Sequence, residues 1–261
     1  MILPNSRVVN NWTRLLWLFL ILLTPRLLLA DQILVATASN FRDAMSALAR
    51  QFESNTGHQV TVIPGSTGKH FAQVVHGAPF DAFFAADSER PQRLESEGLA
   101  VNGSRFTYAI GKLVLWSPQS GLVDPDGAIL KHGNYRHLAI ANPELAPYGR
   151  AAREVIEAMG LWDTLEQRLV RGENIAQAFQ FVQSGNAELG FVALSQLKTG
   201  KHSMDGSQWA IPVDLYGAIE QQAVLLQESE VARDFFSFVQ SAQAAKIIRA
   251  HGYETPGHDE P

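Results

Sequence analysis

The sequence predicts an α/β protein with two lobes and a ligand cleft between them. Short apolar strands alternate with amphipathic helices over most of the chain. A long apolar strand at 108–117 and a glycine- and proline-rich loop at 118–134 separate a first round of this alternation from a second. Because repeated βα units build a sheet with helices on both faces, each round predicts one lobe with a parallel sheet.

The first round begins directly after Asp31. The expected strands are 33–38, 60–63 and 81–86, and the expected helices are 41–55, 69–76 and 91–98. The first helix is amphipathic, because its apolar residues recur at helical spacing, at Phe41, Met45, Leu48, Ala49 and Phe52. Gly57 is placed to end it.

The second round follows the long strand. The expected strands are 137–141, 188–194 and 221–226, and the expected helices are 150–160, 175–185 and a closing helix at 231–245. Residues 200–209 are expected to form a loop and 255–261 a disordered tail. This order predicts a first lobe of residues 31–109 plus 222–261 and a second lobe of residues 110–221.

Residues 1–30 have the pattern of a signal peptide. Arg7 and Arg14 precede the apolar run 15–23, and small and apolar residues end at Ala30. The alternative is an uncleaved anchor, but the run is shorter than the ~20 residues that span a bilayer. We therefore expect cleavage near Ala30 and a periplasmic protein.

Composition narrows the function classes. The chain has no cysteine, which excludes disulfides, thiolate metal sites and a lipid anchor on cysteine. Its formal net charge is −5, and loss of residues 1–30 removes three arginines and no acidic residue. Such an acidic protein is not expected to bind nucleic acid.

Four turns are the candidate functional features, because each combines small or hydroxyl-bearing residues with the predicted start of a helix. A helix start presents free backbone N–H groups and a partial positive charge, and several of them directed at one point bind an anion. Each turn alone is equally well explained as an ordinary helix cap. The turns are Ser39-Asn40, Ser66-Thr67-Gly68, Pro147-Tyr148-Gly149 and Asn174-Ile175.

Other motifs do not indicate catalysis or a cation site. Arg42, Lys69 and Arg150 lie near the turns, but their positions in amphipathic helices favour solvated flanks over ligands. The segment GSTGK lacks the spacing of a phosphate loop, and there is no G-x-S-x-G or H-E-x-x-H. No nucleophile with a matching base is visible, so the chain is not expected to be an enzyme.

The sequence also resembles a known family. The segments ATASNF, GSTGKHFAQVVHGAPFDAFFAAD, SRFTYAIGKLVLW, AIANPELAPYGRAA, LGFVALSQ and AAKIIRAHGY are similar to those of periplasmic molybdate-binding proteins of ABC transporters. The resemblance implies a type II periplasmic-binding fold. It also implies binding of molybdate or tungstate through neutral hydroxyls and main-chain N–H groups, delivery to a membrane permease, and no cofactor. Carried over by position, the oxyanion-binding residues are Ser39, Asn40, Thr67, Tyr148 and Ile175. We expect a monomer.

One position departs from the family pattern. Some members place a tyrosine hydroxyl where this chain has Ala193, and Asn40 is the candidate replacement donor. Sulfate or another tetrahedral oxyanion remains an alternative ligand, since cavity size would decide between them. An ester hydrolase is a more distant alternative, with Asp87 or His70 as the base.

Overall fold

The computed structural model describes residues 31–198 and 205–257. The expected signal peptide and its cleavage site lie outside these residues. Within them, no helix combines the length and the apolar character needed to cross a membrane. The described chain contains two five-stranded sheets.

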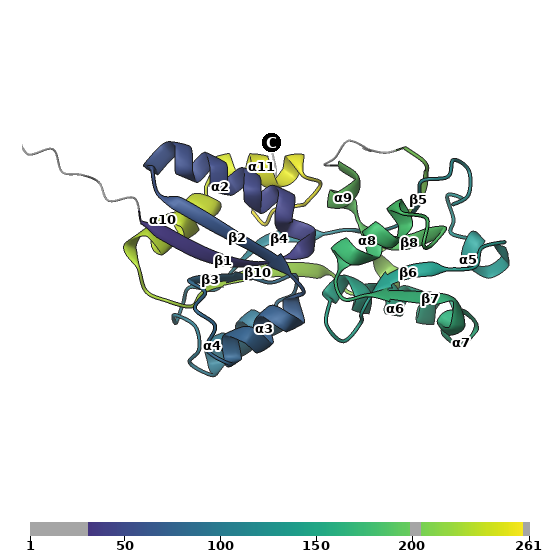
Figure 1. Ribbon diagram of the computed structural model, residues 1–261, viewed down its shortest axis with the longest axis horizontal. Coiled ribbons are helices and arrows are strands. Elements are labelled where there is room, and N and C mark those ends of the chain that lie inside the picture. Colours follow the sequence, from purple (N-terminus) through teal and green to yellow (C-terminus); the bar gives the residue numbers. More distant parts are fainter. Residues whose placement is uncertain (1–30, 199–204, 258–261) are drawn as a thin grey trace, which may run out of the picture. The chain divides into compact units, whose positions relative to one another are not determined.

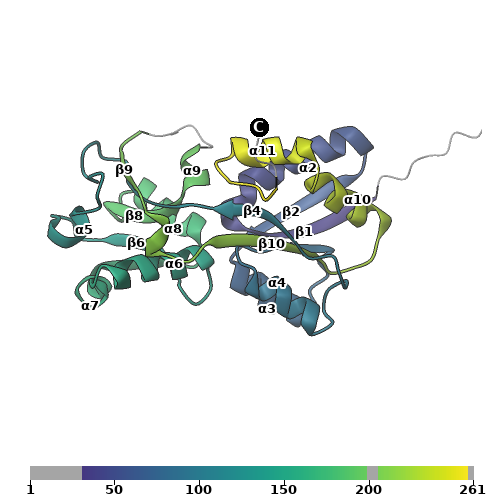
Figure 2. The same ribbon diagram turned by 180° about the vertical axis from the view of Figure 1, so that it is seen from behind.

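The first sheet has the strand order β2-β1-β3-β10-β4. Its central strands are parallel, since β1 pairs in parallel with both β2 and β3. However, β10 runs antiparallel to β3 and β4, so the prediction of a parallel sheet is wrong at this edge. The reason is topological: β10 enters from the second sheet instead of following a helix of the first (Figure 2). The strands are β1 (Gln32–Ala38), β2 (Gln59–Gly65), β3 (Ala82–Phe84), β4 (Phe106–Gly111) and β10 (Ile219–Leu225).

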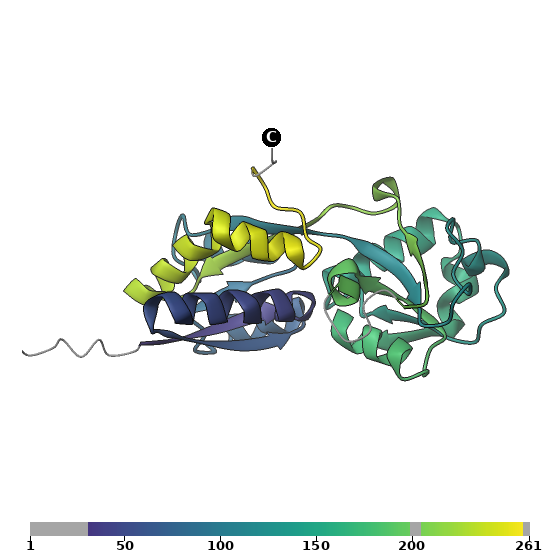
Figure 3. The ribbon, with the colours of Figure 1, turned by 90° about the horizontal axis from the view of Figure 1, so that it is seen from above.

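Helices cover both faces of the first sheet. Figure 1 shows α2, α10 and α11 on one face and α3 and α4 on the other. Figure 3 shows α11 beside α2, which it contacts. The predicted amphipathic face of α2 is confirmed, because Phe41, Met45, Leu48 and Phe52 are buried in one apolar cluster. The bounds are η1 (Ser39–Phe41), α2 (Arg42–Thr56), α3 (Thr67–Val75), α4 (Glu89–Ser96), α10 (Glu230–Val239) and α11 (Ala242–Ala250).

The second sheet has the order β7-β6-β8-β5-β9. It is also mixed: β6 is parallel to β7 and β8, whereas β5 is antiparallel to β8 and β9. The strands are β5 (Leu113–Ser117), β6 (Leu138–Ala141), β7 (Leu169–Gly172), β8 (Leu189–Ala193) and β9 (Ser207–Ala210). The helices are α5 (Ile129–His132), α6 (Pro147–Ala158), α7 (Trp162–Leu165), η2 (Glu166–Arg168), α8 (Ile175–Gln183), α9 (Leu194–Lys198) and η3 (Val213–Leu215).

The two sheets are joined where one long strand was expected. The segment 108–117 divides at Lys112: β4 pairs in the first sheet and β5 in the second. The carbonyl of Lys112 accepts a hydrogen bond from Leu194 N at 2.9 Å instead of continuing a strand ladder. The chain returns through 211–218 into β10.

Three other predictions need correction. The loop expected at 200–209 is replaced at its end by β9, whose Trp209 is buried, and residues 200–204 lie outside the described part. The single helix expected at 231–245 is two helices, because Ser241 caps α11 by accepting a hydrogen bond from Ala244 N. In the tail expected at 255–261, Thr255 accepts a hydrogen bond from Arg249, and residues 258–261 lie outside the described part.

Candidate functional site

All four turns are helix starts at the carboxyl ends of parallel strands, as predicted. Ser39 opens η1 after β1, and Thr67 opens α3 after β2. Pro147 opens α6 in the segment that follows β6, and Ile175 opens α8 after β7. This edge of a parallel sheet is where ligands of open α/β sheets bind.

Ser39 and the start of α8 form a first pair. The Ser39 Oγ accepts a hydrogen bond from Ala176 N at 3.4 Å. Asn174 caps α8 with its side-chain oxygen, which accepts from Ala176 N and Gln177 N. The N–H of Ile175 has no acceptor among the described residues. This pair therefore offers one hydroxyl proton and one main-chain N–H.

Thr67 and the start of α6 form a second pair. The Thr67 Oγ1 accepts a hydrogen bond from Ala86 N at 3.1 Å, which leaves its own proton to donate. The next residue, Gly68, donates its N–H to the Leu145 carbonyl at 2.8 Å, close before the start of α6. In the described chain the N–H of Tyr148 has no acceptor, so this pair also offers a hydroxyl and an amide.

The two pairs belong to one packed region. Ala38 directly precedes Ser39, and Ala86 donates its N–H to Thr67. Both alanines lie in the same buried cluster as Tyr148 and Ile175. A buried glutamine, Gln221, further links the turns: it accepts from Asn40 Nδ2 at 2.8 Å and donates to Tyr148 Oη at 3.4 Å. The structure thus pairs Ser39 with the start of α8 and Thr67 with the segment before α6, and links Asn40 to Tyr148 through Gln221.

The side chain of Asn40 is not available to donate to an anion, contrary to the expectation from the sequence. Its amide nitrogen donates to Gln221 Oε1 and to Tyr253 Oη, at 2.8 and 3.1 Å, and the residue is 5% exposed. Both amide protons are therefore engaged inside the protein. Any contribution of Asn40 to an anion has to come from its main-chain N–H.

Sequence reasoning missed the polar residues around Asn40. Tyr253 donates its hydroxyl proton toward the Asn40 carbonyl at 2.6 Å and lies 2.9 Å from Ser195 Oγ. Ser195 also donates to the Asn40 carbonyl. Burial raises the pKa of Tyr253, so its hydroxyl stays protonated. Ser195 and Tyr253 both lie in segments that carry the family resemblance, LGFVALSQ and AAKIIRAHGY, but nothing in those segments gives them a role, because they come together only through the fold.

The basic side chains near the turns are engaged by carboxylates. Arg42 pairs with Asp43 at 3.1 Å, Lys69 pairs with Glu173, and Arg150 pairs with Glu89 at 3.0 Å. They are also partly exposed. This agrees with the prediction that they flank the site instead of holding the anion.

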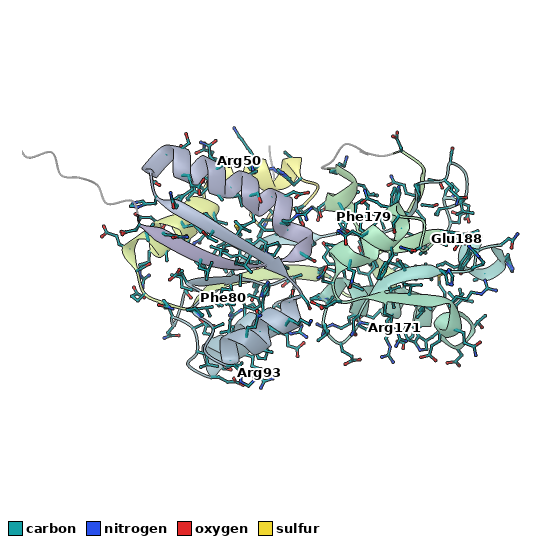
Figure 4. The ribbon with its side chains drawn as sticks, viewed as in Figure 1. Arg50, Phe80, Arg93, Arg171, Phe179 and Glu188 are labelled. Atoms are coloured by element: carbon teal, nitrogen blue, oxygen red, sulfur yellow. The ribbon has the colours of Figure 1, made fainter. Side chains whose placement is uncertain are left out.

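The two residues considered as a general base are both buried and have polar partners within the protein. Burial raises the pKa of Asp87, and its ion pair with Arg90 opposes that rise. His70 is 4% exposed, with Nδ1 3.0 Å from Gln73 Oε1 and its ring edge-on to Phe80, which Figure 4 labels. The described residues contain no group of three metal-ligating side chains.

Two cavities adjoin the turns. One of about 280 Å³ is lined by Ser39, Arg42, Asn174 and Ala176. The other, of about 310 Å³, is lined by Ala86, Asp87, Pro147 and Arg150. Ala193 on β8, the position where the family resemblance suggested a tyrosine hydroxyl, is fully buried and adds no hydroxyl.

Helix starts and hydroxyls of this kind can bind an oxyanion. Two hydroxyls and two helix-start amides present four protons, two from each sheet, and no unpaired cation is placed with them. Hydrogen bonds to a charged group contribute about 1.5–3 kcal/mol each, and the helix starts add a favourable field. A small tetrahedral dianion matches four such donors.

Comparison with known proteins agrees with this geometry. Residues 33–254 match the family model described as bacterial extracellular solute-binding protein. The chain is 48% identical over 227 residues to the molybdate-binding protein ModA of Azotobacter vinelandii, covering 86% of this chain and 90% of that protein. It is 45% identical over 229 residues to ModA of Rhodobacter capsulatus, with coverages of 87% and 89%.

The fold comparison points the same way. The solved structure of an Azotobacter vinelandii periplasmic molybdate-binding protein superimposes with a TM-score of 0.83 at 44% identity, over 86% of this chain and 99% of that one. The two sheets are therefore the two lobes of a periplasmic-binding fold. This chain belongs to the bacterial extracellular solute-binding protein family, in the group that contains the molybdate-binding proteins.

Proposed function

We propose that this chain binds molybdate or tungstate outside the cytoplasm and delivers it to the permease of an ABC importer. The observation that carries the proposal is the donor set: Ser39 and Thr67 each have their acceptor side already used by a backbone N–H. Each hydroxyl keeps its own proton to donate toward a ligand, and an oxyanion accepts such protons without bringing any of its own. The relatives named molybdate-binding proteins support the choice of ligand.

We propose Ser39, Thr67, Tyr148 and Ile175 as the ligand donors, with Asn40 taking part through its main-chain N–H. The first lobe would comprise residues 31–109 plus 222–261, and the second residues 110–221. Because each lobe supplies two donors, the anion is held by all four only when the lobes are closed, and binding favours the closed form. The protein would act as a monomer in the periplasm, with no resident cofactor and no catalytic step.

Isothermal titration calorimetry on residues 31–261 tests this function. Molybdate, tungstate, sulfate and phosphate are titrated separately into the purified protein. We expect molybdate and tungstate to bind with micromolar affinity or better and sulfate to bind much more weakly. Sulfate binding as tightly as molybdate would contradict the specificity, and absence of heat with all four anions would contradict the function.

A further inference from the structure

Two residues beside the donor Thr67 make a direct hydrogen-bonded contact between the lobes. Ser66 Oγ donates to the carbonyl oxygen of Leu145 at 2.7 Å. Gly68 N donates to the same oxygen at 2.8 Å. One carbonyl of the second lobe therefore satisfies a hydroxyl and a helix-start amide of the first, and neither of these protons is left for the anion.

The Leu145 carbonyl sits in a rigid turn that leads to a proposed ligand donor. Asn142 holds this turn, because its carbonyl accepts from Leu145 N and Ala146 N at 3.1 and 2.9 Å. Two residues after Leu145, α6 begins at Pro147, followed by Tyr148 with its free N–H. A contact that fixes Leu145 thus also fixes the direction of the Tyr148 N–H relative to Thr67.

The contact is close-packed as well as hydrogen-bonded. Ser66 is 1% exposed. A Cβ atom on Gly68 would lie 2.9 Å from the Leu145 oxygen and 3.1 Å from the Leu145 Cα. Both are backbone atoms of a held turn, so they cannot move aside as a flexible side chain could. Only glycine at this position lets the two lobes approach this closely.

We infer that Ser66 and Gly68 are positioning residues that close the lobes on the Leu145 carbonyl and set the spacing of the donors around the anion. This inference rests on the proposed function and deepens it. Part of the free energy of closure then comes from contacts between the lobes themselves. Loss of these contacts should favour the open form and release the anion faster.

Two variants separate this role from direct anion binding. Ser66→Ala removes one of the two hydrogen bonds and leaves the Leu145 carbonyl with its other donor. Gly68→Ala blocks the approach, while alanine in a helix keeps α3 stable. Ser46→Ala is the matched control, because its hydroxyl donates to Arg42 O within α2 at 2.8 Å and makes no contact between lobes.

Closure can be followed by a distance between two spin labels. Because the chain contains no cysteine, Ala72→Cys on α3 and Thr164→Cys on α7 give one exposed label in each lobe. Electron–electron double resonance reports the distance with and without molybdate, and stopped-flow dilution reports its release. The melting temperature without ligand shows whether each variant is folded.

For Ser66→Ala we expect molybdate release about 3- to 10-fold faster, the effect of one net hydrogen bond, and a smaller closed fraction without ligand. For Gly68→Ala we expect affinity about 30-fold weaker or more, as overpacking predicts, and a long label distance even at saturating molybdate. Thr67→Ala should weaken binding without changing the ligand-free distance.

The outcomes are distinguishable. If Ser66→Ala and Gly68→Ala close and release molybdate as the parent protein does, or if Ser46→Ala changes closure equally, the inference is wrong. If the parent protein itself binds none of the four anions, the proposed function fails instead.

Discussion

At the scale of single residues, the hydroxyls of Ser39 and Thr67 each hold one backbone N–H and keep a proton to donate. The N–H groups come from different elements, Ala176 for Ser39 and Ala86 for Thr67. One engaged lone pair restricts the rotation of each hydroxyl and leaves its proton for a ligand. In the proposed site, these neutral donors bind the anion without a countercharge.

Substitution of these hydroxyls should weaken binding directly. Ser39→Ala and Thr67→Ala are each expected to weaken molybdate binding by about 1–3 kcal/mol, the value of a hydrogen bond to a charged group, with the fold intact. Arg42→Ala serves as the control and should change affinity little, because Arg42 is exposed and paired with Asp43. Calorimetry measures all three, and a larger loss for Arg42→Ala than for either hydroxyl would refute binding by neutral donors.

A second prediction concerns Gly111, the last residue of β4 before the chain crosses to the second sheet. A Cβ atom on Gly111 would lie 2.1 Å from Tyr148 Oη and 2.7 Å from Gln221 Nε2. Gly111→Ala should therefore displace Tyr148 and lower the free energy of unfolding by about 1–3 kcal/mol, as urea unfolding would measure.

A double variant checks the cause of that loss. Tyr148→Phe removes the oxygen nearest the new methyl group and keeps the main-chain N–H. Gly111→Ala combined with Tyr148→Phe should lose less stability than the sum of the two single changes. Additive losses would show that the collision with Tyr148 is not the cause.

The limits of sequence reasoning at this scale are clear from Asn40. Ser39, Thr67, Tyr148 and Ile175 could be selected because helix starts have local signatures. The partners of the Asn40 side chain, Gln221 and Tyr253, are 181 and 213 residues away along the chain. Only the folded chain shows that this amide faces inward.

At the scale of elements, α3 carries both the proposed donor Thr67 and a buried histidine, His70. His70 lies one turn after Thr67, and a Cβ on Gly65 would lie 2.5 Å from its Nε2. Burial lowers the pKa of His70, although Gln73 and the carbonyls of Ile63 and Thr37 favour the protonated ring. The folded protein therefore holds this histidine in its neutral form.

This burial predicts a pH dependence of stability. The unfolded chain takes up the proton at higher pH than the folded one, so the contribution of His70 is complete above its ordinary pKa of 6.5 and is lost as pH falls through the lowered value. In urea unfolding from pH 7.5 to 5, His70→Gln should show a weaker pH dependence than the parent. One proton accounts for at most about 1.4 kcal/mol per pH unit. Identical slopes would exclude His70 as the source.

Helices and strands could be predicted from the sequence where a local residue pattern determines them. Strand direction and short strands could not, because they depend on pairing with distant strands. The helices after β1, β2 and β7 follow from apolar spacing, and the last of them is also capped by the Asn174 side chain. In contrast, β10 reads like any buried strand, and its antiparallel direction depends on where the chain crosses between sheets. The short β7 and β9 were missed because tertiary pairing, not composition, makes them strands.

At the scale of the whole molecule, residues near the end of the described chain contact the β4–β5 junction and the turn that contains Asn40. Ile110 and Glu254 form an isolated antiparallel bridge, and Lys112 pairs with Glu254. Tyr253, next to this bridge, reaches the Asn40 carbonyl and Ser195 Oγ. Residues from three distant parts of the sequence thus meet at one hydroxyl.

Removal of that hydroxyl tests its role. Tyr253→Phe keeps the ring, which packs edge-on to Phe41 at 5.2 Å, but loses the contacts of the hydroxyl with the Asn40 carbonyl, the Asn40 side-chain amide and Ser195 Oγ. We expect the free energy of unfolding to fall by about 1–3 kcal/mol, measured by urea unfolding without ligand. Phe106→Leu, an apolar change on β4 that removes no side-chain hydrogen bond, gives a comparison, and unchanged stability of Tyr253→Phe would mean that the contacts are not net stabilising.

The two crossings between the sheets, at Lys112 and at 211–218, have a mechanical consequence. A single tether would let the halves swivel freely, whereas two neighbouring tethers allow bending about the line that joins them and resist twisting. Capture and release should therefore follow one path, along which the four protons separate together and never one at a time.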